Sequence, residues 1–175
     1  MERQYHGFQY ENYCSDKYGV NLNSNYTDKW DGTYKGYPVS VKSISQGAEI
    51  CMGDIVRQSQ INEDFYMFVA FHDDTKKIVE EHCLFVKGDQ YSSLFNKSLI
   101  TSYKTLLSEI TNDKIDDNKW KKSIIDYRKQ WESSTPNLIR PRPKRDHKKQ
   151  KRIQCAISNA DFYSYFIPRY EVGVN

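Results

Sequence analysis

Long apolar runs are missing from this sequence. No stretch approaches the roughly 20 consecutive apolar residues that a membrane-spanning helix requires. The first residues, MERQYHGFQYENYC, lack the apolar centre of a secretory signal peptide. We therefore expect a cytoplasmic protein with no membrane partner.

Paired cysteines are also missing. The sequence contains no CxxC pair, which argues against a zinc knuckle and does not call for disulfides. The four cysteines are widely separated: Cys14, Cys51, Cys83 and Cys155. We expect them to be mostly buried free thiols.

Two nucleic-acid signatures are absent as well. Neither His72 nor His147 has the partners of an HNH-type metal nuclease. No RRM or KH signature accompanies the 14 tyrosines, which disfavours an RNA-binding module. Internal repeats are absent too. Because 175 residues are enough for one domain and too few for two, we expect a single domain, with a core over about 3–86 and a helical, basic part over about 89–175.

Positive charge is concentrated in one segment. Residues 140–152, RPRPKRDHKKQKR, hold eight basic residues and one acidic residue. That segment carries +7, and since the whole chain carries +3, the remainder carries −4. A local cluster of this density is typical of proteins that bind phosphate backbones.

Hydrophobic periodicity predicts an α/β order of elements. The first half of the chain is expected to contain a helix at 3–19 that stops at Gly19, strands at 29–34 and 37–44, a helix at 47–61, and strands at 65–71 and 78–86. The second half is expected to contain helical pieces at 90–95, 101–110 and 117–133, a strand at 152–158 and a final helix from 159.

The hairpin WDGTYKGYPVSVKS, residues 30–43, brings reactive side chains together. A turn centred on residues 35 and 36 would place Asp31 opposite Ser40, on one face. Lys42 would point to the same face, because side chains alternate along a strand. The residues between them are expected to point into the core: Val39 and Val41.

Four motifs in this region resemble those of one nuclease superfamily. They are Gly7-x-x-x-Glu11 on the first helix, KWDG at 29–32, PVSVK at 38–42 and DIVRQ at 54–58. Their order resembles the PD-(D/E)XK nuclease superfamily, which includes many type II restriction endonucleases. The resemblance covers about residues 7–86 and implies a restriction-endonuclease-like mixed sheet flanked by helices. It also implies Mg²⁺-dependent hydrolysis of double-stranded DNA.

Ser40 departs from the family pattern, which has an acid at this position. Some members keep Ser-x-Lys and take the acid from the following helix. In the expected helix at 47–61, Asp54 shares a face with Arg57 and Gln58, whereas Glu49 lies about 140° away from Asp54. Asp54 is therefore our preferred replacement acid, and Glu49 the alternative.

The resemblance assigns a role to each candidate residue. Asp31 and Asp54 would bind Mg²⁺ through hard oxygen ligands. Lys42 would position the attacking water or stabilise charge at the scissile phosphate. Gln58 would orient a water, and Glu11 would join the metal or its water shell. A solvent-facing Asp and Lys on an ordinary hairpin is the structural alternative.

The basic segment is expected to contact DNA. Pro141 and Pro143 would stiffen it into an extended arm, whereas the alternative is a disordered basic tail. Arginine can pair with guanine edges and glutamine with adenine. The candidate DNA-binding residues are Arg140, Arg142, Lys144, Arg145, Lys148, Lys149, Gln150, Lys151, Arg152 and Gln154.

The sequence thus favours a type II restriction enzyme that acts as a homodimer on palindromic DNA. Two alternatives stay open. One is a structure-specific nuclease of the same fold, such as a junction resolvase or a repair nuclease. The other is a non-catalytic DNA-binding protein in which Ser40 marks a decayed site.

Overall fold

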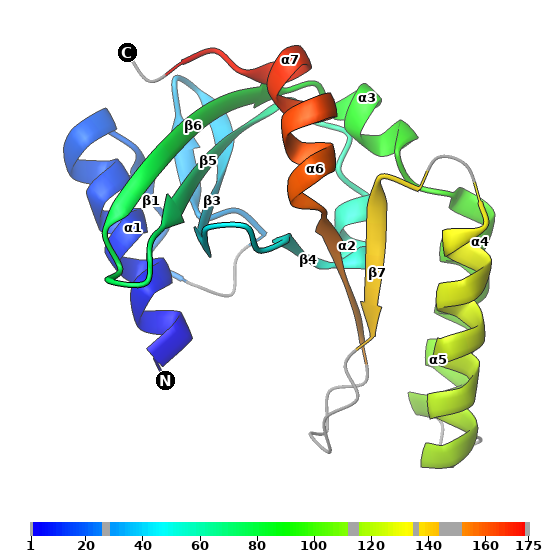
Figure 1. The fold of residues 1–175 in the computed structure, drawn as a ribbon. Helices are drawn as coiled ribbons and strands as arrows, with labels where there is room; N and C mark the ends of the chain where they lie inside the picture. The colour runs from blue at the N-terminus through cyan, green and yellow to red at the C-terminus, as the bar shows by residue number, and fades with distance from the viewer. Residues whose placement is uncertain (1, 26–28, 112–115, 135–136, 144–151, 174–175) are drawn as a thin grey trace. The chain divides into compact units, whose positions relative to one another are not determined.

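The chain folds into two compact units in the computed structural model (Figure 1). The structure describes residues 2–25, 29–111, 116–134, 137–143 and 152–173. Unit 1 comprises residues 1–50, 62–89 and 159–175, and unit 2 comprises residues 51–61 and 90–158. No helix among the described residues is long and apolar enough to cross a membrane.

Unit 1 contains a five-stranded mixed sheet in the order β1-β2-β3-β5-β6. Its strands are β1 (Asn21–Leu22), β2 (Gly32–Tyr34), β3 (Tyr37–Ser45), β5 (Phe65–His72) and β6 (Ile78–Val86). β3 and β5 are parallel, and the other pairs are antiparallel. The expected α/β class with a mixed sheet is confirmed.

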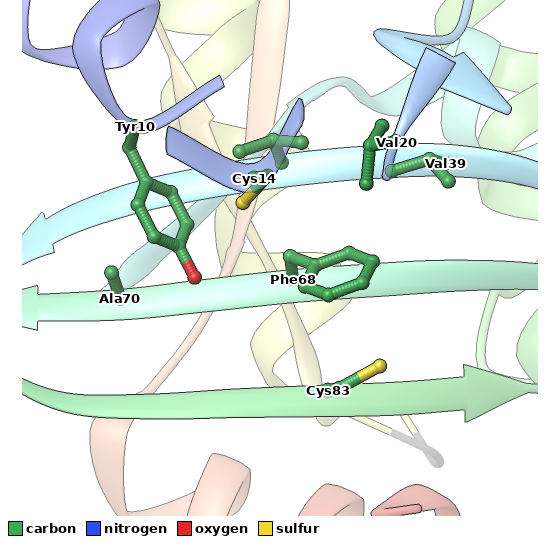
Figure 2. Close-up of a cluster of buried hydrophobic side chains, with 8 residues drawn as sticks. Tyr10, Cys14, Val20, Val39, Phe68, Ala70 and Cys83 are labelled. Atoms are coloured by element: carbon green, nitrogen blue, oxygen red, sulfur yellow. The ribbon is translucent and has the colours of Figure 1, made fainter. Parts of the chain in front are cut away.

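Helix α1 (Glu2–Tyr18) covers one face of this sheet. Tyr10 and Cys14 point from the helix onto the strands, where they pack against Val39, Phe68 and Cys83 (Figure 2). The helix ends as expected at residue 19, a glycine with φ of +76°. This conformation lets the next amide reach back to the helix end, which is the usual reason for glycine there.

The opposite face of the sheet contacts the C-terminal helical segment. That segment consists of α6 (Asn159–Asp161), the π-helix η1 (Phe162–Phe166) and α7 (Ile167–Tyr170). Phe162 packs edge-on against Phe71 and His82. The His82 ring also contacts two carboxylates, each at 2.7 Å: Glu80 on the same strand and Glu171 after α7. These contacts fix the C-terminal segment against β6.

Unit 2 contains a three-stranded sheet in the order β4-β8-β7. Its elements are β4 (Ile50–Asp54), α2 (Ile55–Ser59), α4 (Lys97–Thr111), α5 (Asp117–Glu132), β7 (Ile139–Pro143) and β8 (Ile153–Ile157). Helix α3 (Gly88–Ser93) begins in unit 1 and ends in unit 2. α4 and α5 lie side by side (Figure 1). The predicted apolar stripe of α5 is buried: Trp120, Ile124, Tyr127 and Trp131.

Strand β8 differs in one respect from the expected half-buried strand. Ile153, Cys155 and Ile157 are buried as predicted, but Ala156 on the other face is also buried. β8 is the central strand of its sheet, between β4 and β7.

The helix predicted over 47–61 is wrong for its first half. Residues 50–54 form strand β4, and only 55–59 are helical. Gly53 has φ of +110°, which no α-helix contains. The burial of Ile50 and Met52 around the exposed Cys51 shows the two-residue period of a strand.

Candidate functional site

Asp31 lies immediately before β2 and is fixed by its own backbone and side chain. Its N–H donates to the carbonyl of Val39 at 2.9 Å, and its carbonyl accepts from Asn23 at 3.0 Å. One carboxylate oxygen, Oδ2, accepts from the N–H of Val41 at 2.6 Å. The carboxylate is therefore held against the backbone of β3, and no other hydrogen bond or ion pair in the described chain involves its side chain.

The neighbouring Gly32 permits this geometry. A Cβ at this position would collide with the carbonyl of Asn21 on β1. Glycine thus allows β1 to approach closely just where Asp31 leaves the sheet.

The expected register of the hairpin is correct only up to Gly32. Residues whose numbers sum to 71 pair as predicted: Gly32 with Val39, Thr33 with Pro38 and Tyr34 with Tyr37. The pairing does not extend to Asp31 and Ser40, because Asp31 bonds instead to Val39 and Val41. The prediction that Asp31 lies directly opposite Ser40 is therefore wrong.

Lys42 lies on β3, on the face opposite Val41, as the alternation predicts. Val39 and Val41 are buried in the core under α1, while Ser40 and Lys42 are half-buried on the other side of the strand. No hydrogen bond or ion pair of the Lys42 ammonium is found with the described residues. Its charge is nevertheless close enough to lower the pKa of Glu11.

Glu11 lies on α1 and is half-buried. Burial raises the pKa of its carboxyl above the ordinary value of 4.5, and the negative charge of Asp31 raises it further. The ammonium of Lys42 acts in the opposite direction. The two carboxylates and the ammonium are therefore electrostatic neighbours within unit 1, although they come from three separate elements.

A cavity of about 470 Å³ lies beside the two carboxylates. Both Glu11 and Asp31 line it. The remaining lining residues come from α1, from β1 and the residues after it, and from the segment before β2: Gly7, Phe8, Asn12, Leu22, Asn23, Ser24, Asn25 and Trp30. The asparagines of this lining, Asn12, Asn23 and Asn25, were not among the residues predicted from the sequence, because no motif marks them.

Of the remaining candidates from the expected second helix, Asp54 and Gln58 belong to unit 2 and Glu49 to unit 1. Asp54 is the N-cap of α2, and its Oδ1 accepts from the N–H of Arg57 at 3.0 Å. Gln58 accepts a hydrogen bond from the hydroxyl of Tyr91 at 2.7 Å. Glu49 precedes β4 and is on no helix. The helical face that was expected to present Asp54 with Gln58 therefore does not exist.

The two carboxylates of this cavity are the candidate metal ligands. Glu11 and Asp31 supply oxygen ligands of the kind that Mg²⁺ prefers. Across the residues placed by the structure, no three His, Cys, Asp or Glu side chains form a group suited to a metal ion. A cation there would need water or substrate oxygens for its remaining positions, which is usual for Mg²⁺.

The basic segment begins as a strand of a sheet. Arg140 and Arg142 lie on β7, whose edge position tolerates Pro141 and Pro143. Arg142 pairs with Gln154 of β8, and Arg152 directly precedes that strand. Residues 140–143 of the expected extended arm are thus part of strand β7. Six of the candidates lie outside the described residues: Lys144, Arg145, Lys148, Lys149, Gln150 and Lys151.

Comparisons with known proteins do not extend this description. No protein-family model, no curated protein and no solved structure matches the chain.

Proposed function

We propose that this protein is a Mg²⁺-dependent endonuclease that hydrolyses phosphodiester bonds of double-stranded DNA, as a type II restriction enzyme. The observation that carries the proposal is that Glu11 and Asp31 line one cavity, while the charge of Lys42 acts on Glu11. The resemblance to PD-(D/E)XK nucleases calls for two acids and a lysine. Here Glu11 lies on a helix, Asp31 at the hairpin and Lys42 on the central strand β3.

Each residue of the group has a physical role in this proposal. Asp31, oriented by the Val41 amide, and Glu11 would hold Mg²⁺. The bound cation would neutralise charge on the phosphate and lower the pKa of the attacking water. No carboxylate among the described residues lies within 4 Å of the Lys42 ammonium. Lys42 would supply a fixed positive charge to the phosphate.

This proposal replaces Asp54 by Glu11 as the second acid. Asp54 is engaged as a helix cap, whereas Glu11 and Asp31 line the same cavity. A homodimer would present two such groups to a palindromic site.

The test is cleavage of supercoiled plasmid DNA in the presence of Mg²⁺. Discrete fragments are expected from the wild type, and loss of cleavage with retained DNA binding from Asp31→Asn and Lys42→Ala. The matched control is Lys35→Ala, which removes an exposed ammonium from the turn of the same hairpin. Equal cleavage by Lys42→Ala and Lys35→Ala would refute the assignment.

A non-catalytic DNA-binding protein is the second candidate. It is favoured by the lack of a third metal ligand in the described part of the chain and by the use of Asp54 as a cap. This alternative predicts a gel shift without cleavage at any Mg²⁺ concentration. Selective cutting of cruciform DNA would instead indicate a junction resolvase.

A further inference from the structure

A second charged site lies in unit 2, between α5 and β7. A cavity of about 190 Å³ is lined by three arginines, Arg128, Arg140 and Arg142. Glu132 is the one acidic side chain in its lining, and Asn137 and Trp131 complete it. The lining therefore carries a net formal charge of +2.

The arrangement leaves donor groups of Arg128 available. Its Nε donates to Glu132 at 2.7 Å, one helical turn away. This is the one hydrogen bond found for the Arg128 side chain in the described chain, so its two terminal nitrogens keep their N–H groups for a ligand. One terminal nitrogen of Arg142 donates a long hydrogen bond of 3.3 Å to the carbonyl of Pro141.

The framework around these arginines is rigid. The indole of Trp131 is fully buried and donates to the carbonyl of Ile139, which joins α5 to β7. Arg140 and Arg142 alternate with Ile139 and Pro141, both buried, and so share one face of the strand. Guanidinium groups held on a fixed frame suit a tetrahedral oxyanion, which each fork can bind through two parallel bonds.

We infer that this arginine-lined cavity binds a phosphate group. A cavity of about 190 Å³ accommodates a single phosphate or phosphodiester group. The shared chemistry is the phosphate oxyanion, supplied either by a DNA backbone or by a small phosphate compound. The DNA source rests on the proposed function, whereas the small-ligand source does not.

The experiment compares the wild type with Arg128→Gln and with a matched control, Lys129→Gln. Both variants remove one positive charge from the same turn of α5, but Lys129 is exposed and does not line the cavity. A third variant, Glu132→Gln, removes the negative charge from the lining. Binding of inorganic phosphate and pyrophosphate is measured by calorimetry, and binding of a DNA duplex by fluorescence anisotropy over a series of salt concentrations.

If the ligand is a DNA phosphodiester, Arg128→Gln should reduce the slope of log K against log salt by about one, while Lys129→Gln leaves the slope unchanged. If the ligand is a small phosphate, Arg128→Gln should weaken pyrophosphate binding at least tenfold with unchanged DNA binding. Glu132→Gln should strengthen whichever binding is observed. Equal behaviour of Arg128→Gln and Lys129→Gln in all measurements would overturn the inference.

This outcome is separable from that of the proposed function. Plasmid cleavage reports on Asp31 and Lys42 in unit 1, and phosphate binding reports on Arg128 in unit 2. A wild type that binds pyrophosphate through Arg128 but cuts no plasmid would refute the nuclease proposal alone. A wild type that cuts plasmid, with Arg128→Gln and Lys129→Gln binding phosphate, pyrophosphate and DNA equally well, would refute the phosphate site alone.

Discussion

At the scale of single residues, folding disfavours the ionised form of the Glu11 side chain. Burial and the nearby charge of Asp31 both raise its pKa, and only Lys42 opposes them. Groups held at an energetic cost are common at functional sites, where a ligand offsets the cost. The same feature makes the role of Glu11 measurable without any assay of activity.

Glu11→Gln should therefore stabilise the metal-free protein at neutral pH. Because folding raises the pKa of Glu11, its stabilising contribution is complete below the ordinary value of 4.5 and is lost as pH rises through the folded pKa. The variant, which cannot ionise there, should have the higher melting temperature at pH 7 and no advantage near pH 4.

Added Mg²⁺ provides the control for this prediction. The wild type should gain more melting temperature from Mg²⁺ than the Glu11→Gln variant does, because a bound ion stabilises the state that holds it. Equal gains for the two proteins would argue against a metal at this carboxylate.

The four cysteines are also distinguished one by one. Burial raises the pKa of Cys83 to about 11 and that of Cys14 to about 12. Cys155 is fully buried, whereas Cys51 is exposed. Since the thiolate is the reactive form, burial and a raised pKa both disfavour reaction at Cys14 and Cys83, whereas the Cys51 thiol is accessible.

One thiol in four should consequently react with Ellman's reagent in the folded protein at pH 8. The remaining three should react only after denaturation. Cys51→Ser should abolish the fast phase, and a fast phase that survives this change would contradict the burial described for the other thiols.

At the scale of elements, Asp54 is the N-cap of α2, and substitutions there can distinguish a structural role from a catalytic one. Asparagine also caps helices well, whereas alanine at an N-cap costs about 1 kcal/mol. Asp54→Asn should therefore keep both stability and DNA cleavage, and Asp54→Ala should lose about 1 kcal/mol of unfolding free energy. Chemical denaturation and the plasmid assay measure the two effects.

Loss of cleavage in Asp54→Asn with unchanged stability would restore Asp54 as a metal ligand.

Local sequence patterns predicted several elements well. The hairpin between β2 and β3 follows from Lys35 and Gly36, whose positive φ angles of 49° and 82° are those of a tight hairpin turn. The stripe on α5 follows from spacing alone. In contrast, β4 was mistaken for helix, because its five residues continue directly into the short helix α2. Only pairing with β8 reveals the strand.

At the scale of the whole molecule, unit 2 is not a continuous segment. Residues 51–61 leave unit 1 to supply most of β4 and α2, and the chain then returns before entering unit 2 again at residue 90. β8 therefore lies between a strand that follows α5 and one that precedes β5.

A fragment of residues 90–158 should not fold by itself. It lacks β4 and α2, so one side of β8 would have no partner, and the buried Ile50, Met52 and Ile55 would be missing from the apolar packing. Circular dichroism and dispersion of amide resonances should indicate an unfolded chain. Cooperative unfolding of this fragment would show that unit 2 folds without residues 51–61.

The sequence by itself determined the α/β class, the hairpin, most helices and the candidates Glu11, Asp31 and Lys42, because periodicity and turn residues act over short distances. Tertiary structure alone decided that Glu11 neighbours Asp31, that Asp54 caps a helix, and that Arg128 joins two arginines of β7. Glu11 and Asp31 are 20 positions apart, and Arg128 is 12 and 14 positions from the two arginines, so no local pattern encodes these two relations. The cap depends on β4 ending at Asp54, which strand pairing decides.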